Sequence, residues 1–179
     1  MKELIGNMTL LFSKDDIKKR VSEIGQAVSN EFKGKDPIFI GVLNGSFMFM
    51  ADLLRSVNID CEIDFIKIRS YVGKSSSGTI QLIKDISADV TNRNIILVED
   101  IIDSGHTIRF LRDRITGASP KSISIITLLI KQDIAKLDFS VDFIGFEIPP
   151  DFVVGYGLDY NQKLRHLDAI YRLDEVIEP

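Results

Sequence analysis

One stretch near the middle of the chain constrains its fold more than any other. Residues 95–107 have the sequence IILVEDIIDSGHT, in which four apolar residues lead into two adjacent carboxylates, Glu99 and Asp100. Asp103 follows after an apolar pair, and a small polar turn over residues 104–107 comes next. This order predicts a buried parallel strand that ends at the acidic pair, followed by a loop that opens a helix. Ligands of open α/β sheets collect at such carboxyl ends of strands.

The length and composition of the chain fit one globular domain. Its 179 residues are 45% apolar and 27% charged, which allows one substantial core but not a second full domain. The net charge of −4 provides no basic field for nucleic acid, so local groups must hold any anionic ligand. The single cysteine, Cys61, excludes an intramolecular disulfide and is expected to be an inert core thiol.

The N-terminus and the apolar runs indicate a soluble protein. The first residues, MKELIGNMTLLF, lack the charged start, long apolar run and small-residue cleavage site of a signal peptide. No apolar run approaches the roughly 18 residues that a membrane helix needs. We therefore expect a cytoplasmic protein with no membrane partner.

Predicted strands and helices alternate through residue 130, which favours an α/β fold with a mostly parallel sheet and right-handed crossovers. Ser13 and Asp16 form a capping-box-like start to an amphipathic helix over residues 13–33. Further helices are expected over residues 47–57 and directly after residue 107. Strands are expected over residues 38–43, 62–69, 80–83, 95–100, 121–130, 141–146, 153–155 and 169–173.

The segment between two of these strands has an unusual composition. Residues 71–79, YVGKSSSGT, contain two glycines and three consecutive serines and show no apolar periodicity. This composition is typical of a loop rather than a packed element. On the residues alone, a long hairpin connection and a functional lid are equally good interpretations.

The central stretch contains the groups needed to bind a sugar phosphate. Vicinal carboxylates such as Glu99 and Asp100 suit the vicinal hydroxyls of a ribose, directly or through a divalent cation. Residues 104–107 would place backbone N–H groups at a helix N-terminus, which favours a phosphate. Together these sites describe ribose 5-phosphate. Taken singly, Glu99 and Asp100 are better explained as solvated strand-end charges, and Asp103 as an ordinary N-cap.

The combination is more specific than its parts. Residues 95–107 closely resemble the phosphoribosyl pyrophosphate signature of the type I phosphoribosyltransferases, in the EDIID form of the hypoxanthine-guanine branch. The resemblance extends from about Ser13 to Leu173. The other matching segments are the pyrophosphate loop Leu43-Asn44-Gly45-Ser46, the lid pair Ser70-Tyr71, the purine-reading Lys131, the base-binding hood segments Phe146–Pro149 and Phe152–Asn161, and Arg165.

The resemblance implies a purine salvage reaction with Mg²⁺ as cofactor. Phosphoribosyl pyrophosphate and a 6-oxopurine, hypoxanthine or guanine, would give IMP or GMP plus pyrophosphate, with Asp103 as the catalytic general base. The implied ribose 5-phosphate ligands are Glu99, Asp100, Asp103, Ser104, Gly105, His106 and Thr107. The pyrophosphate would be held by Leu43, Asn44, Gly45 and Arg165, the purine by Lys131, Phe152, Val153 and Asp159, and the magnesium by Glu99, Asp100 and Asp159. Ser70 and Tyr71 would be the first residues of the lid segment.

At three of these positions the resemblance raises the question of whether the side chain or the backbone would bind the substrate. The Lys131 ammonium has donors and no acceptor, so it can bond a 6-oxo group but not the 6-amino group of adenine. His106 is expected to contribute its backbone N–H rather than its imidazole. Asn44 stands where the family often has lysine, so backbone N–H groups would bind the pyrophosphate there. The family commonly has a non-proline cis peptide at this point, which makes Leu43–Asn44 a candidate for one.

The implied architecture is the type I phosphoribosyltransferase fold, a single domain over residues 1–179. Its core would span residues of about 37–140, with a small hood from about 1–12 and 141–179. Family members are usually homodimers or homotetramers. Alternatives are a xanthine-preferring enzyme and a non-catalytic phosphoribosyl-sensing regulator of RNA or DNA, although an acidic chain disfavours nucleic acid. A plain ribose-phosphate module leaves the second cluster, from Lys131 to Arg165, unexplained.

Overall fold

The computed structural model describes residues 8–71 and 79–174, and its main sheet has six strands. Their order is β4-β3-β2-β5-β6-β7, and only β3 and β4 pair antiparallel. The predicted α/β fold with a mostly parallel sheet is thus confirmed. The strands are β2 (Ile38–Leu43), β3 (Glu62–Tyr71), β4 (Thr79–Lys84), β5 (Asn94–Ile102), β6 (Ser122–Ile130) and β7 (Phe143–Glu147).

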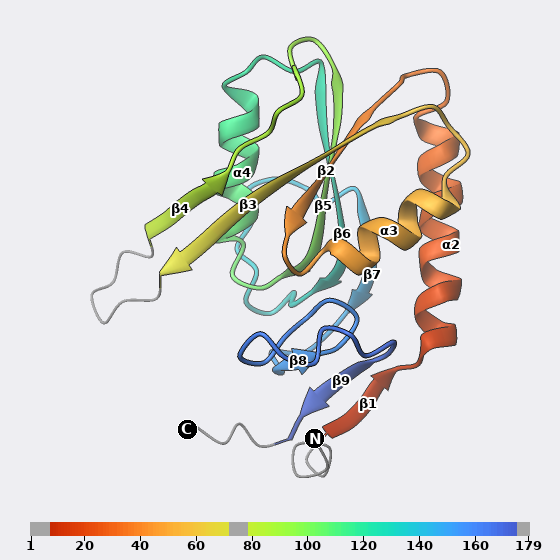
Figure 1. Cartoon of the computed structure of the whole chain (residues 1–179), viewed down its shortest axis with the longest axis vertical. Helices are drawn as coiled ribbons and strands as arrows, with labels where there is room; N and C mark the ends of the chain where they lie inside the picture. Colours follow the sequence, from red (N-terminus) through yellow and green to blue (C-terminus); the bar gives the residue numbers. More distant parts are fainter. Residues whose placement is uncertain (1–7, 72–78, 175–179) are drawn as a thin grey trace.

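Helices cover both faces of this sheet (Figure 1). Helices α2 (Lys14–Glu31) and α3 (Phe47–Ser56) lie on one face, and α4 (His106–Thr116) lies on the other. Alternate residues of β5 face the two layers: Ile96 and Val98 belong to the α2 and α3 core, whereas Ile95 and Leu97 belong to the α4 core. Burial on both faces explains why this strand is a continuous apolar run.

The start of α2 follows its sequence closely. The Asp16 amide donates to Ser13 Oγ at 3.2 Å, and the Ser13 amide donates to Asp16 Oδ2 at 3.0 Å. These two bonds are the predicted capping box, which satisfies donors that the first helical turn leaves free. Among the described residues, no helix is both long and apolar enough to cross a membrane.

A second, three-stranded sheet forms the hood. Its strands are β1 (Met8–Phe12), β9 (Ile170–Leu173) and β8 (Val153–Val154), paired antiparallel in the order β1-β9-β8. The arrowheads of β2 and β7 point toward this small sheet, so the hood lies beyond the carboxyl ends of the parallel strands (Figure 1). Ligands of open α/β sheets bind at that edge.

The boundary of the hood differs from the sequence prediction. Residues 143–147, expected in the hood, form β7 and pair parallel with β6 in the main sheet. The hood segment therefore follows β7 rather than beginning at residue 141. The Phe146 ring of β7 stacks on Phe12 of β1 at 4.0 Å between centroids, which connects the main sheet to the hood.

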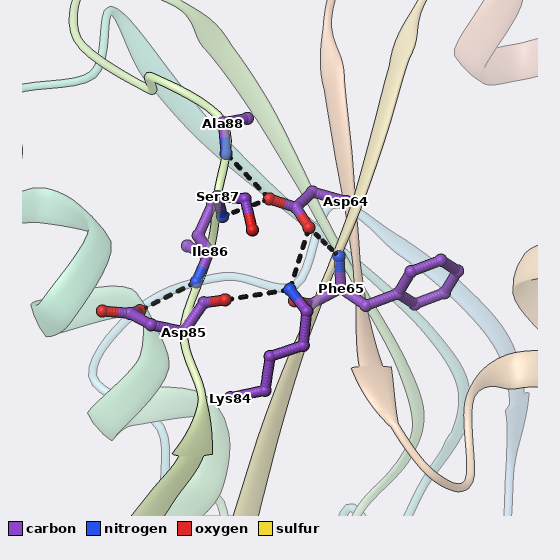
Figure 2. A network of polar contacts seen from close by, with 7 residues as sticks. All are labelled: Asp64, Phe65, Lys84, Asp85, Ile86, Ser87 and Ala88. Carbon is purple, nitrogen blue, oxygen red and sulfur yellow. Dashed lines mark hydrogen bonds and ion pairs between the residues drawn. The ribbon is translucent and has the colours of Figure 1, made fainter.

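Asp64 of β3 holds the connection that leads from β4 to β5 (Figure 2). Its carboxylate accepts hydrogen bonds from the amides of Phe65 at 2.7 Å, Ser87 at 2.5 Å and Ala88 at 2.9 Å. Lys84 Nζ lies 3.1 Å from the same carboxylate. Burial acts to raise the pKa of Asp64, but the amide hydrogen bonds and the Lys84 ammonium outweigh it and lower the pKa to about 2.

We expect Asp64→Asn to lower the free energy of unfolding by about 2 kcal/mol at pH 7. A carboxylate with a lowered folded-state pKa stabilises the protein above its unfolded pKa of about 4, and the contribution is lost as the pH falls through about 2. The loss should therefore shrink to about half by pH 3. Urea denaturation at pH 7, 5 and 3 measures it, with the exposed Asp60→Asn as control. An equal loss at all three pH values would contradict this account.

Candidate active site

The acidic pair lies inside β5 rather than at its end. The sequence predicted a strand that ends in the acidic pair, but the strand continues to Ile102, with Glu99 opposite Thr127 of β6. The strand extends because β6 is long enough to supply hydrogen-bonding partners. Glu99 is 5% exposed, and its Oε2 atom has no hydrogen-bond partner among the described residues. Burial, and then the charge of Asp100, raise the pKa of Glu99 well above its usual value.

Asp100 lies against the loop that follows β2, residues 43–46. A Cβ atom on Gly45 would overlap the Asp100 carboxylate, so only glycine allows this approach. The peptide bond between Leu43 and Asn44 is cis, as the resemblance implied. The predicted pyrophosphate loop and the acidic pair are therefore in direct contact, although Gly45 and Asp100 are 55 residues apart in the chain.

Next to Asp100 is a pocket of about 290 Å³ between β5, the end of β6 and the hood. Six of its lining residues were predicted from the sequence as site residues. Two more, Ile101 and Leu158, were not predicted, although both lie within the matching segments. The lining residues are Asp100, Ile101, Asp103, Lys131, Phe152, Val153, Leu158 and Asp159.

Lys131 and Asp103 form an ion pair in this pocket. Lys131 Nζ lies 3.1 Å from Asp103 Oδ2, and the lysine side chain is only 10% exposed whereas that of Asp103 is 55% exposed. A lysine directly after a strand would ordinarily be a surface residue, but this one is buried beneath the pocket. The pair places a cationic donor and a carboxylate acceptor side by side, which suits a substrate with an oxygen and an acidic ring proton.

An aromatic side chain borders the same pocket. Phe152 is 43% exposed, which is high for a large apolar residue, and its ring meets that of Tyr160 edge-on at 6.0 Å between centroids. Val153 follows as the first residue of β8. An accessible ring beside polar groups can stack on a planar heterocycle.

A second ion pair lies at the hood side of the site. Arg165 Nη2 is 2.7 Å from Asp159 Oδ1, and Arg165 Nη1 donates to the Gly157 carbonyl at 2.7 Å. Burial raises the pKa of Asp100 to about 6, while the positive charge of Arg165 opposes the shift and the negative charge of Asp159 adds to it. Asp100, Asp159 and Arg165 therefore interact within one charged cluster.

The predicted 5′-phosphate loop precedes α4. Gly105 is the helix N-cap with φ +86°, and α4 begins at His106. His106 Nδ1 lies 2.9 Å from Ser104 Oγ, so its imidazole contacts the loop itself. The first amides of a helix have no partner within it and can bind a phosphate. Residues 104–107 do not line the 290 Å³ pocket but directly follow its Asp103.

The carboxylates can hold part of the coordination shell of a divalent cation. In residues 8–71 and 79–174, no three His, Cys, Asp or Glu side chains form a group that could hold a metal ion by itself. However, Asp100 and Asp159 line the same pocket, and Glu99 has a buried oxygen that no described residue hydrogen-bonds. Such a set fits a hard cation that also takes water and substrate oxygens as ligands.

The predicted lid can be followed only at its base. Ser70 and Tyr71 end β3 and pair with Ile80 and Thr79 of β4. Their side chains and residues 72–78 lie outside the described residues. The two strands that flank this segment, β3 and β4, pair with each other, and the predicted loop itself lies outside the described residues.

Similarity to known proteins extends over most of this chain. The family model for the phosphoribosyl transferase domain matches residues 11–161. Hypoxanthine phosphoribosyltransferase of Escherichia coli K12 is 42% identical over 164 residues, which cover 90% of this chain and 92% of that protein. Hypoxanthine-guanine phosphoribosyltransferase of Bacillus subtilis 168 is 43% identical over 162 residues, which cover 90% of each.

A solved structure extends the agreement to the fold. The crystal structure of a hypoxanthine phosphoribosyltransferase from Staphylococcus aureus has a TM-score of 0.90 with this chain at 33% identity, covering 96% of this chain and 94% of that one. Both the sequence and the arrangement of its elements are thus shared over nearly the whole length. The chain belongs to the phosphoribosyltransferase family.

Proposed function

We propose that this protein transfers the 5-phosphoribosyl group of phosphoribosyl pyrophosphate to hypoxanthine, and also to guanine, in purine salvage. The products are IMP or GMP and pyrophosphate. The observation that carries this proposal is the Lys131–Asp103 pair, which lines one pocket together with Phe152 and Asp100. The names of the Escherichia coli and Bacillus subtilis relatives support the same substrates.

In this proposal each side of the pocket has a separate task. Lys131 donates a hydrogen bond to the 6-oxo group of the purine, and Phe152 stacks on the ring. Asp103 accepts the ring proton as the purine attacks the anomeric carbon of the ribose. Proton removal keeps the purine nucleophilic while the bond to pyrophosphate breaks.

The remaining groups bind the ribose phosphate and the leaving group. Glu99 and Asp100 accept hydrogen bonds from the ribose hydroxyls, and residues 104–107 bind the 5′-phosphate. Arg165 and the amides of loop 43–46 hold the pyrophosphate. Mg²⁺, held by Glu99, Asp100 and Asp159 with water, would neutralise charge that develops on the departing pyrophosphate.

A turnover assay tests the proposal. The purified chain is mixed with phosphoribosyl pyrophosphate, Mg²⁺ and one purine base, and nucleotide and pyrophosphate are quantified. We expect equal amounts of both products with hypoxanthine, and a rate with adenine lower by about 10⁴. Preference for xanthine would assign a different purine, and preference for adenine would contradict the role of Lys131. Salt-dependent RNA or DNA binding without turnover would indicate a regulator instead.

We expect Gly45→Ala to weaken the binding of phosphoribosyl pyrophosphate. The added Cβ overlaps the Asp100 carboxylate, and overpacking of this kind costs about 1–3 kcal/mol. The KM for phosphoribosyl pyrophosphate should rise about 10- to 100-fold, with the KM for hypoxanthine within about twofold of the parent. Steady-state kinetics with each substrate varied in turn measures both. Gly117→Ala at the exposed end of α4 is the control, and a parental KM in Gly45→Ala would contradict the proposed loop contact.

Assembly as a homodimer or homotetramer in the cytoplasm stays a prediction. It rests on the resemblance to a family whose members usually have these states. Light scattering of the purified chain during size-exclusion chromatography distinguishes the two states from each other and from a monomer.

A further inference from the structure

The hood contacts the main body at a turn over residues 155–158, which follows β8. The Tyr156 hydroxyl donates a hydrogen bond to Asp52 Oδ2 of α3 at 2.8 Å. The next residue, Gly157, lies so close to the Gly45 carbonyl that a Cβ atom on it would overlap that oxygen. Tyr156 is 5% exposed, whereas the side chain of its partner Asp52 is 48% exposed.

The turn has an uncommon backbone. Gly155, Tyr156 and Gly157 all have positive φ, at 95°, 49° and 99°. A bulky residue such as tyrosine adopts this conformation only where surrounding contacts hold it. Here the Tyr156 amide donates to the Leu167 carbonyl at 2.8 Å, and the Gly157 amide donates to the Arg165 carbonyl at 2.9 Å. These contacts direct the tyrosine side chain away from the hood and toward α3.

Each residue of the Tyr156–Asp52 bond lies in a segment that also contains proposed substrate-binding groups. Helix α3 directly follows loop 43–46, so Asp52 and the proposed pyrophosphate-binding amides belong to one continuous segment of the chain. On the hood side, Asp159 lines the purine pocket and Arg165 donates to the Gly157 carbonyl. The bond therefore joins the segment that would hold the pyrophosphate to the segment that would hold the purine.

Packing around this bond is incomplete. A cavity of about 430 Å³ lies between α2, α3 and the hood, and both Tyr156 and Asp52 line it. Asp52 also pairs with Arg55 at 2.8 Å, but the arginine side chain is 75% exposed, and exposed ion pairs contribute little. The Tyr156 ring belongs to the same buried apolar cluster as residues of α2 and α3, and its hydroxyl bonds to Asp52 at the edge of this cavity.

We propose that Tyr156 is a positioning residue that sets the distance between the hood and loop 43–46 through Asp52. The inference rests on the proposed function, because it concerns the alignment of purine and phosphoribosyl pyrophosphate for reaction. Misplacement of reacting groups by about 1 Å can cost about 100-fold in rate. A bond that fixes two substrate-binding segments relative to each other therefore affects turnover without touching a substrate.

The test compares Tyr156→Phe, Asp52→Ala and the double variant. Tyr156→Phe removes only the hydroxyl, and we expect about a tenfold fall in kcat and about a tenfold rise in the KM for phosphoribosyl pyrophosphate. The KM for hypoxanthine should stay within about twofold of the parent. Asp52→Ala should have the same effects, and the double variant should be no worse than either single variant because both remove one bond.

Two further variants distinguish a positioning role of Tyr156 from a general effect on folding stability. Asp52→Asn retains an acceptor oxygen and should recover most of the activity, and Arg55→Ala should leave the kinetic constants at parental values. Thermal unfolding is measured for every variant.

Two results would overturn the inference. One is parental kcat and KM in Tyr156→Phe, even if its Tm is lowered. The other is a loss of activity in the double variant that equals the sum of the two single losses. Absence of turnover in the parent chain would contradict the proposed function itself, and the inference with it. Parental constants in Tyr156→Phe would contradict the inference alone.

Discussion

Replacing Asp103 with Asn is expected to lower kcat by about 10² to 10⁴ while the nucleotide product still binds. The carboxylate is the proposed proton acceptor for the purine, and an amide of the same shape cannot accept a proton at neutral pH. Lys131 Nζ lies 3.1 Å from the carboxylate, which places the acceptor beside the group proposed to hold the purine oxygen. The variant keeps a hydrogen-bond acceptor for Lys131, so binding should change less than turnover.

Single-turnover kinetics and calorimetric titration with IMP measure the two effects separately. The matched control is Asp113→Asn, which changes an exposed aspartate of α4 outside the pocket. The Asp103→Asn protein should unfold at nearly the parental temperature. Turnover within about threefold of the parent in a folded Asp103→Asn protein would remove Asp103 from the role of general base.

Replacing Lys131 with Gln is expected to reduce the preference for hypoxanthine over adenine by at least about 100-fold. A site that donates to a substrate oxygen can reject an analogue without that oxygen by about 10⁴. The lysine ammonium has no acceptor, whereas the glutamine carbonyl can accept a bond from the 6-amino group of adenine. Because Lys131 is nearly buried, water cannot readily take over its contact with the base.

The ratio of kcat/KM for the two bases measures this change. Loss of the ion pair with Asp103 should also lower kcat for both bases, but that effect largely cancels in the ratio. Lys121→Gln is the matched control, since Lys121 is exposed at the opposite end of β6. An unchanged preference in Lys131→Gln would mean that other groups read the 6-position of the purine.

Elements with strong local patterns were predicted from the sequence with little error. The strand over residues 38–43 has its predicted bounds, and α3 over residues 47–56 differs from its prediction by one residue. The buried stripe of α4 is Ile108, Leu111 and Ile115, at the helical spacing expected for its sequence. Local periodicity and capping are properties of neighbouring residues, so they are visible in the chain itself.

Elements that depend on distant partners were missed or misplaced. Strand β1 was not predicted, because MTLLF has no regular alternation and its pairing partner β9 lies at the other end of the chain. The end of β5 was placed two residues too early because the acidic pair was taken as the strand end, although β6 continues beside it. In both cases the pairing depends on a strand that local propensity does not reveal.

The kind of reaction could be predicted from the sequence without coordinates. The sequence contains the EDIID run, Lys131 and Arg165 in the order typical of a phosphoribosyltransferase, and these residues can be identified without coordinates. The contacts between distant groups are seen only in the folded chain: Lys131 with Asp103, Gly45 with Asp100, and Tyr156 with Asp52. The reason is physical, since residue types and local spacing follow from the chain, whereas contacts between distant segments exist only after strands pair and helices pack.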